Sequence, residues 1–135
     1  MKFKHYSNED YEAVCGFLIE LNRENQNHIN WNWGRFEWMA EHPEFDKSAT
    51  DSIGLWLDNE RIVGAAIYDM YFGEAFVGVL PEYSAFYPEI LDYAYRELKD
   101  ENGLGSWLKT QKSFGPVFLQ KNTRGYETSR SWCII

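Results

Sequence analysis

The stretch SIGLWLDNERIVGAAIYDMYFGEAFVGVL, residues 52–80, constrains the fold more than any other part of the chain. Ile53, Leu55 and Leu57 occupy alternate positions in its first part, and apolar residues then run almost continuously, which is typical of half-buried and buried strands. Short turn-forming segments at 58–60 and 72–73 interrupt the apolar residues. The strands predicted from this pattern are 53–57, 62–70 and 75–80. Because short turns join antiparallel neighbours, we predict a three-stranded antiparallel meander.

A junction between a strand and a helix follows the meander and determines the topology after it. Pro88 suits the first turn of a helix. Apolar residues then recur at helical spacing, at Ile90, Leu91, Ala94 and Leu98. We therefore predict a helix over 88–100. A further strand is predicted at 106–111, and a helical crossover between two strands of one sheet makes those strands parallel.

The remaining segments complete a mixed fold. Ser7 is a predicted N-cap, with Asp10 as a variant capping box, for a helix that runs to about Glu24. The other predicted elements are strand 1–6, helix 35–42 before Pro43, helix 116–122 and strand 126–135. The predicted fold class is α/β (α+β), a mixed and mainly antiparallel sheet flanked by helices in the order β-α-α-β-β-β-α-β-α-β.

The size and charge of the chain limit its class. With 135 residues, 44% of them hydrophobic, it should form a single domain over residues 1–135. A net charge of −8 argues against general nucleic-acid binding. No apolar run approaches the about 20 residues of a membrane helix. The first ten residues lack the apolar core of a signal peptide, so we expect a cytoplasmic protein with neither nucleic acid nor membrane as a partner.

The cysteines and histidines do not predict a metal site. Cys15 and Cys133 show no metal-ligand spacing with each other or with the three histidines. Cys15 shares a predicted helical face with Val14 and Leu18. We therefore expect a buried, unpaired thiol and no bound metal.

Two short motifs and the order of elements give a resemblance to a known family. The last strand of the meander leads into VLPEY at 79–83, and the end of the chain contains Lys121 and Gly125-Tyr126. In these features the chain resembles the GNAT superfamily of acyl-CoA-dependent N-acetyltransferases. Its members typically show V-x-P-E-Y after the fourth strand, and often Lys-x-Gly-Phe before the last strand, a motif to which this chain adds two residues between Lys121 and Gly125. The resemblance implies a GNAT-like fold and transfer of acetyl from acetyl-CoA to an amine of a small molecule or protein.

The chain departs from this family in the turn that holds the coenzyme A pyrophosphate. Family members continue after V-x-P-E-Y with Arg or Gln, two variable residues, Gly, one residue, and Gly or Ala. The matching positions here are Ser84, Tyr87 and Glu89. Tyr87 replaces a residue whose missing Cβ lets the backbone approach phosphate, and Pro88 removes an N–H donor. Glu89 adds a carboxylate that suits the helix dipole without a ligand. We therefore expect weak or absent acetyl-CoA binding at Ser84 and Tyr87.

The resemblance also implies where the reaction would occur. A backbone N–H on the family's fourth strand usually holds the thioester carbonyl, which would be near Val77, Gly78 or Val79. Glu74 begins this strand as its only carboxylate and would be the general base; the alternative is a solvated turn residue. Tyr126 would substitute for the general-acid tyrosine that family members often have in the last helix.

Aromatic residues would line the acceptor side of the site. Trp33, Glu37 and Trp38 belong to the second predicted helix and its approach, and Tyr68 lies on the second strand of the meander. Aromatic side chains offer a large contact area at low entropy cost, which suits a lid over a ligand pocket. The alternatives are that the tryptophans close one end of the core, that Glu37 is simply exposed, and that Tyr68 packs internally.

Two functional hypotheses from different classes follow from the sequence. The first is an N-acetyltransferase acting on a small-molecule or protein amine. The second is a catalytically silent GNAT-like domain that binds a small ligand or a protein partner. The element order favours the first, the altered turn favours the second, and a homodimer is left open in both. Binding of acetyl-CoA would distinguish the two hypotheses.

Overall fold

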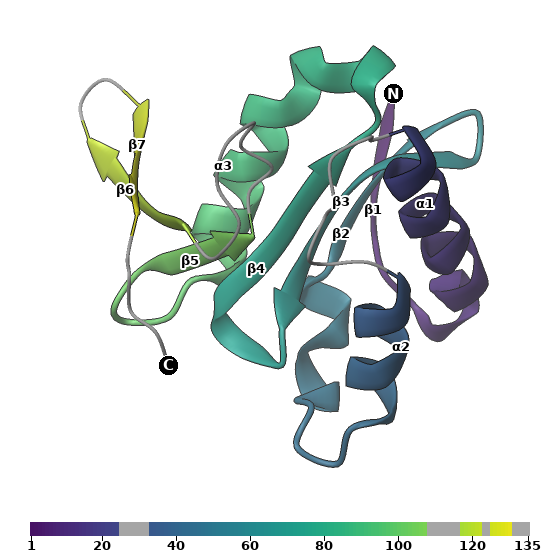
Figure 1. The fold of residues 1–135 in the computed structure, drawn as a ribbon, viewed down its shortest axis with the longest axis horizontal. Helices are drawn as coiled ribbons and strands as arrows, with labels where there is room; N and C mark the ends of the chain where they lie inside the picture. Colours follow the sequence, from purple (N-terminus) through teal and green to yellow (C-terminus); the bar gives the residue numbers. More distant parts are fainter. Residues whose placement is uncertain (25–32, 108–116, 123–124, 131–135) are drawn as a thin grey trace.

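The computed structural model describes residues 1–24, 33–107, 117–122 and 125–130, with side chains up to Leu104. Its described part is one mixed sheet with helices on both faces (Figure 1). The strands are β1 (Lys2–His5), β2 (Gly54–Asp58), β3 (Arg61–Asp69), β4 (Tyr71–Val79), β5 (Leu104–Trp107), β6 (Val117–Asn122) and β7 (Gly125–Arg130). The helices are α1 (Tyr11–Glu24), α2 (Trp33–Glu41) and α3 (Tyr87–Leu98), with 3-10 helices η1 (Asn8–Asp10), η2 (Lys47–Ser52) and η3 (Pro81–Phe86).

The strands lie in the sheet in chain order, from β1 at one edge to β7 at the other. Neighbouring strands are antiparallel except β4 and β5, which are parallel and are connected through α3. The predicted meander and the predicted parallel pair are therefore both confirmed. The parallel pair arises because a helical crossover brings the chain back to the same end of the sheet.

The core lies between the sheet and helices on each of its faces. Helix α3 packs on β3 and β4, whereas α1 packs on β3 from the other side (Figure 1). A Cβ at Gly64 would lie 2.6 Å from Ile90 of α3, and a Cβ at Gly78 would lie 2.9 Å from Leu21 of α1. The two helices thus approach the sheet so closely that a side chain at either glycine would displace a core residue.

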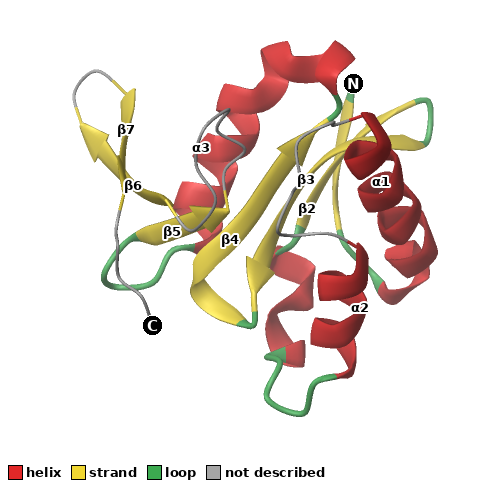
Figure 2. Ribbon diagram, in the orientation of Figure 1, coloured by secondary structure: helices red, strands yellow, loops and turns green. Residues whose placement is uncertain are grey.

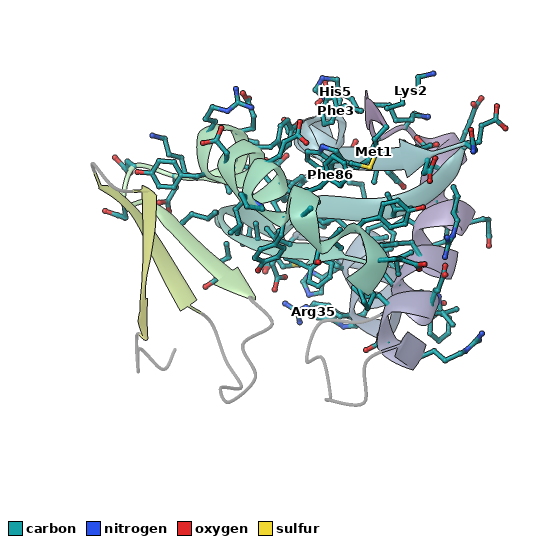
Figure 3. All side chains as sticks on the ribbon, turned by 90° about the horizontal axis from the view of Figure 1, so that it is seen from above. Met1, Lys2, Phe3, His5, Arg35 and Phe86 are labelled. Atoms are coloured by element: carbon teal, nitrogen blue, oxygen red, sulfur yellow. The ribbon has the colours of Figure 1, made fainter. Side chains whose placement is uncertain are left out.

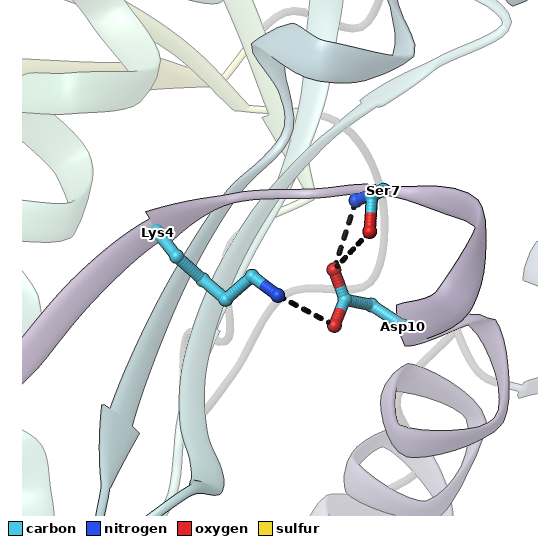
Figure 4. Close-up of polar contacts among 3 residues, drawn as sticks. All are labelled: Lys4, Ser7 and Asp10. Carbon is cyan, nitrogen blue, oxygen red and sulfur yellow. Dashed lines mark hydrogen bonds and ion pairs between the residues drawn. The ribbon is translucent and has the colours of Figure 1, made fainter.

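The start of the first helix is fixed by the predicted capping box (Figure 4). The backbone N–H and the hydroxyl of Ser7 donate to Asp10 Oδ2 at 2.8 and 3.1 Å. Lys4 Nζ on β1 donates to Asp10 Oδ1 at 2.8 Å. One carboxylate therefore satisfies the helix start and ties it to the edge strand.

The first helix also confirms the expectation for Cys15. Cys15 is 5% exposed and unpaired, and Val14 and Leu18 are buried on the same helical face. Cys133 lies outside the described residues.

Among the helices that the structure describes, none has the length and apolar character needed to cross a membrane.

The turn between β3 and β4 lies earlier than predicted. We expected it at 72–73, but the chain reverses at Met70, whose φ is 66°, and β4 already begins at Tyr71. Tyr68 pairs with Ala75 while Asp69 pairs with Tyr71, so residues 72–74 form a bulge on β4. Gly73, the glycine that suggested a turn, lies in this bulge. Its φ of 107° is a backbone conformation that residues with a side chain rarely adopt, which explains why a glycine occupies this position.

The prediction of a helix over 116–122 is wrong. Residues 117–122 form β6, which pairs with β7 as a hairpin in which Asn122 is opposite Gly125 (Figure 2). The β-branched and aromatic residues Val117 and Phe118 favour a strand, and the cross-strand partner in β7 decides the state of this short segment. The predicted element order therefore holds except that its last helix is a strand.

Candidate active site

The candidate active site lies where β4 and β5 run side by side. Their described pairing extends from Glu74 opposite Gly105 to Phe76 opposite Trp107. Strand β4 continues beyond this ladder to Val79, which pairs with Gly64 of β3. Residues 77–79 are paired with β3 on one side, and the residues that follow Trp107 on the β5 side lie outside the described part of the structure. The resemblance to acetyltransferases implies binding of a thioester carbonyl here, by Val77, Gly78 or Val79.

Glu74 lies within the bulge of β4 and not in a solvated turn. It is the fourth residue of the strand and is only partly exposed. By strand alternation its side chain is on the same face as Phe76 and as a Cβ built at Gly78, which would lie 2.9 Å from Leu21 of α1. The interpretation of Glu74 as a solvated turn residue is therefore wrong. A bulge often re-aims a side chain beside a functional site, and here it interrupts β3 pairing next to Glu74.

Three charged side chains from different elements surround Glu74. Asp69 at the end of β3 is 4% exposed and accepts a hydrogen bond from Arg35 Nη2 of α2 at 2.7 Å. Asp100, just after α3, approaches the bulge so closely that a Cβ at Gly73 would lie 2.5 Å from its Oδ2. Burial raises the pKa of Glu74, and the charges of Asp69 and Asp100 raise it further while Arg35 lowers it. A carboxylate with a raised pKa is a better proton acceptor than an ordinary surface glutamate.

Helix α2 carries two exposed aromatic side chains, of which Trp38 lies beside these charges and Trp33 lies beside Cys15 of α1. Trp33 is 43% exposed and Trp38 is 48% exposed, whereas Phe36 and Met39 face the core. The interpretation that the tryptophans close one end of the core is therefore wrong for these two. The Arg35 guanidinium lies over the Trp38 ring, 4.6 Å from its centroid. Figure 3 shows Arg35 on the opposite side of the ribbon from Phe3 and His5 of β1, which places this surface away from the edge strand.

The other predicted acceptor residues occupy different environments. Glu37 is exposed on α2. Tyr68 is fully buried, stacks on Phe45 with ring centroids 5.3 Å apart, and donates its hydroxyl to the Asp46 carbonyl. Tyr126 lies on strand β7, opposite Lys121 of β6, and not on a helix. Its side chain lies outside the described part of the structure.

The predicted coenzyme A turn is helical along almost its whole length. The backbone winds through η3 into α3, with a single non-helical residue at Tyr83. The N–H of Tyr83 donates to the Leu80 carbonyl, and that of Tyr87 donates to the Ser84 carbonyl. These two donors are thus used inside the chain. Ser84 is exposed, whereas Tyr87 packs against the core, where burial raises the pKa of its hydroxyl.

The sequence did not predict the three charged neighbours of Glu74. Arg35 and Asp69 are 34 positions apart, and no local pattern connects them. The one available signal was Asp69 itself, an ionisable residue at the end of an apolar strand.

Among the described residues, no group of three or more His, Cys, Asp or Glu side chains is arranged to hold a metal ion.

Comparison with known proteins supports the fold. The sequence matches no protein-family model and no curated protein. The structure is similar to that of the ribosomal-protein-S18-alanine N-acetyltransferase from Escherichia coli, with a TM-score of 0.52 and 14% sequence identity. The similarity covers 94% of this chain and 88% of that enzyme. The chain therefore has a mixed α/β fold of the GNAT-like kind.

Proposed function

We propose that this chain is an N-acetyltransferase of the GNAT type, which transfers acetyl from acetyl-CoA to a primary amine. The observation that best supports this function is the partly buried Glu74 at the paired end of β4 and β5, just before residues 77–79. The fold resembles that of an enzyme named for acetylating a protein alanine. The acceptor is thus an amine of a protein or of a small molecule.

The proposed reaction requires a neutral amine and a stabilised oxyanion. Glu74 accepts a proton from the acceptor ammonium, and the amine nitrogen then forms a bond to the thioester carbonyl carbon. A backbone N–H of residues 77–79 stabilises the oxygen, which develops negative charge in the tetrahedral intermediate. The carbon–sulfur bond breaks as the carbonyl reforms. The Tyr126 hydroxyl would donate a proton to the sulfur and take up the proton that the nitrogen loses. Glu74 releases its proton to water, so the products are an amide, the coenzyme A thiol and one proton.

Helix α2 supplies the proposed acceptor wall. Trp38 offers exposed aromatic area beside Arg35, and Trp33 and Glu37 would extend this wall toward α1, where Glu37 offers a carboxylate that attracts a cationic amine. Tyr126 is the proposed proton donor to the leaving sulfur. Tyr68 is buried and would have only an indirect effect on the acceptor. Its hydroxyl donates to the carbonyl of Asp46, the N-cap of η2, and so helps to fix the position of that helix.

The proposed binding of acetyl-CoA is weak because the junction before α3 is altered. Pro81 and Pro88 have no N–H, and the N–H groups of Tyr83 and Tyr87 donate to carbonyls of the chain. We therefore expect a Kd in the micromolar to millimolar range, roughly −8 to −4 kcal/mol. Residues 77–79 would contribute the thioester contacts, and Ser84 and Tyr87 would border the pyrophosphate.

Calorimetry with acetyl-CoA tests this proposal directly. Saturable binding, together with release of free thiol when an amine is added, is the expected result. Alanine-terminated peptides, lysine peptides and small diamines would serve as the acceptor panel. The absence of a binding signal at millimolar acetyl-CoA would overturn the proposal and favour the hypothesis of a catalytically silent domain.

A further inference from the structure

Arg35 joins two parts of the candidate site that are far apart in the sequence. Its Nη2 lies 2.7 Å from Asp69 Oδ1, which connects α2 to the end of β3. The Asp69 side chain is 1% exposed, whereas that of Arg35 is 36% exposed. A carboxylate buried to this degree needs a cation or several donors to remain charged, and Arg35 is a cation within reach. The pair therefore holds α2 at the start of the β4 bulge.

The same guanidinium also contacts the proposed acceptor wall. It lies 4.6 Å from the centroid of the Trp38 ring, three residues later on α2. The Trp38 ring contacts His42 with centroids 4.7 Å apart. One side chain thus bonds a buried carboxylate on the sheet and packs on an exposed indole of the helix.

We propose that Arg35 is a positioning residue, which holds the Trp38 ring and the buried Asp69 carboxylate together at the β4 bulge that carries Glu74. This role rests on the proposed function, because Glu74 is the base of that reaction. Arg35 itself touches neither the amine nor the thioester in this proposal. Its effect passes through Asp69, through Trp38 and through the electric field at Glu74.

The charges that face Glu74 determine the expected sign. Among the described residues they are Asp69 of β3, Arg35 of α2 and Asp100 after α3. Burial has the largest effect and raises the pKa of Glu74, followed by Asp69, which also raises it, and then Arg35, which lowers it. Removing Arg35 should therefore raise this pKa further, and removing Asp69 should lower it. Because Asp69 has the larger effect, removing both should leave the pKa below that of the parent.

The test is a titration of the Glu74 carboxyl carbon by NMR in protein without substrate, assigned by its loss in Glu74→Gln. The expected pKa order is Arg35→Met highest, then the parent, then Arg35→Met/Asp69→Asn, with Asp69→Asn lowest. Arg35→Lys should stay close to the parent because it keeps the charge. The double variant remains informative if Arg35→Met fails to fold, because it leaves no buried charge without a partner. Arg61→Met is the control, since Arg61 is an exposed, ion-paired arginine on the β2–β3 hairpin.

The pH profile of kcat/KM provides the second readout. Its acidic limb should move in the same order as the titration. At neutral pH the kcat/KM of Arg35→Met should be about 10-fold lower than that of the parent. This decrease is smaller than the roughly 10²–10⁴-fold decrease expected for loss of the base itself. Arg35→Lys should recover most of that loss.

The two readouts separate this inference from the proposed function. A folded Arg35→Met variant whose Glu74 titrates as in the parent, or a folded double variant whose Glu74 titrates as in Asp69→Asn, would overturn the inference even if the protein is an acetyltransferase. Conversely, the expected titration order in a protein without acetyl transfer would support the effect of Arg35 on Glu74 and overturn the proposed function. A shift of equal size in Arg61→Met would also overturn the inference, since the effect would then not be specific to Arg35.

Discussion

Glu74 owes its proposed chemistry to its surroundings more than to its residue type. It is partly buried in a strand, with the carboxylates of Asp69 and Asp100 near it and the guanidinium of Arg35 opposing them. Each of these neighbours comes from a different element. The basicity of the group is therefore a property of the assembled fold, which is typical of functional sites.

Replacing this carboxyl should abolish most of the proposed activity without disturbing the fold. Glu74→Gln keeps the shape of the side chain but cannot accept a proton, so kcat should fall by about 10²–10⁴-fold. Acetyl-CoA affinity should be unchanged. The measurement is thiol release at saturating acetyl-CoA, with Glu97→Gln, an exposed glutamate on α3, as the matched control. Parent-like activity in Glu74→Gln would show that Glu74 is not the base.

The same substitution should change stability in a pH-dependent way. The raised folded-state pKa of Glu74 means that the fold favours the protonated carboxyl over the charged one. The resulting contribution to the free energy of unfolding is fully present below the unfolded pKa of about 4.3 and is lost as pH rises through the folded-state pKa. Glu74→Gln should therefore be more stable than the parent at pH 7 and nearly equal to it at pH 4. Thermal unfolding at the two pH values measures this. A difference that does not grow with pH would contradict the raised pKa.

At the scale of the element, helix α3 contributes to the core along one face. Leu98 is fully buried, whereas Leu91 is only partly buried, although both were predicted to face inward. Leu98→Ala should lower the free energy of unfolding by about 2–5 kcal/mol, because it removes buried methyl groups and leaves a cavity. Leu91→Ala should cost less than the lower end of that range. Urea unfolding of the two variants measures the difference, and an equal cost would contradict the observed orientation of the helix.

The junction between β4 and α3 is the second element whose chemistry can be tested. Ser84→Arg, Tyr87→Gly, Pro88→Ile and Glu89→Gly together add a cation, return an N–H donor and remove a carboxylate. Charge-assisted hydrogen bonds contribute about 1.5–3 kcal/mol each, and each glycine costs about 1 kcal/mol. Coenzyme A affinity should therefore rise by about 10-fold or more.

Calorimetry of the parent and this variant with coenzyme A, at matched salt, measures the change. The variant should also be less stable, because Tyr87 packs against the core and Pro88 suits the helix start. Equal affinity in a folded variant would mean that the junction does not limit binding. Tight binding by the parent would mean that the helical junction already holds the phosphates in another way.

At the scale of the whole molecule, stability should decrease from the centre of the sheet to its β1 edge. Strand β3 is paired on both sides, is covered by α1 and α3, and is buried along nearly its whole length. Strand β1 pairs only with β2 among the described strands and is mostly exposed. Native-state hydrogen exchange should therefore be slowest in β3 and much faster in β1. Equal protection of β1 and β3 would contradict this, and would point to a partner that covers the edge.

Local patterns in the sequence predicted most of the elements. The start of the first helix follows from Ser7 and Asp10, which lie three residues apart and bond each other directly. The helix that starts near Pro88 and the strands before it follow from periodicity and from short turns. The strand at 117–122 was missed because its strand state depends on pairing with β5 and β7. Short segments of this kind are decided by their neighbours more than by their own propensity.

The sequence by itself determined the fold class and placed Glu74 and residues 77–79 together on one strand, because residues adjacent in a strand stay adjacent in space. It could not place Arg35 beside Asp69, nor Asp100 beside Gly73. Those contacts depend on how α2 packs on the sheet and where the chain leaves α3. Only the tertiary structure determined the charge around Glu74, since electrostatic interaction depends on distance and burial in three dimensions and not on separation along the chain.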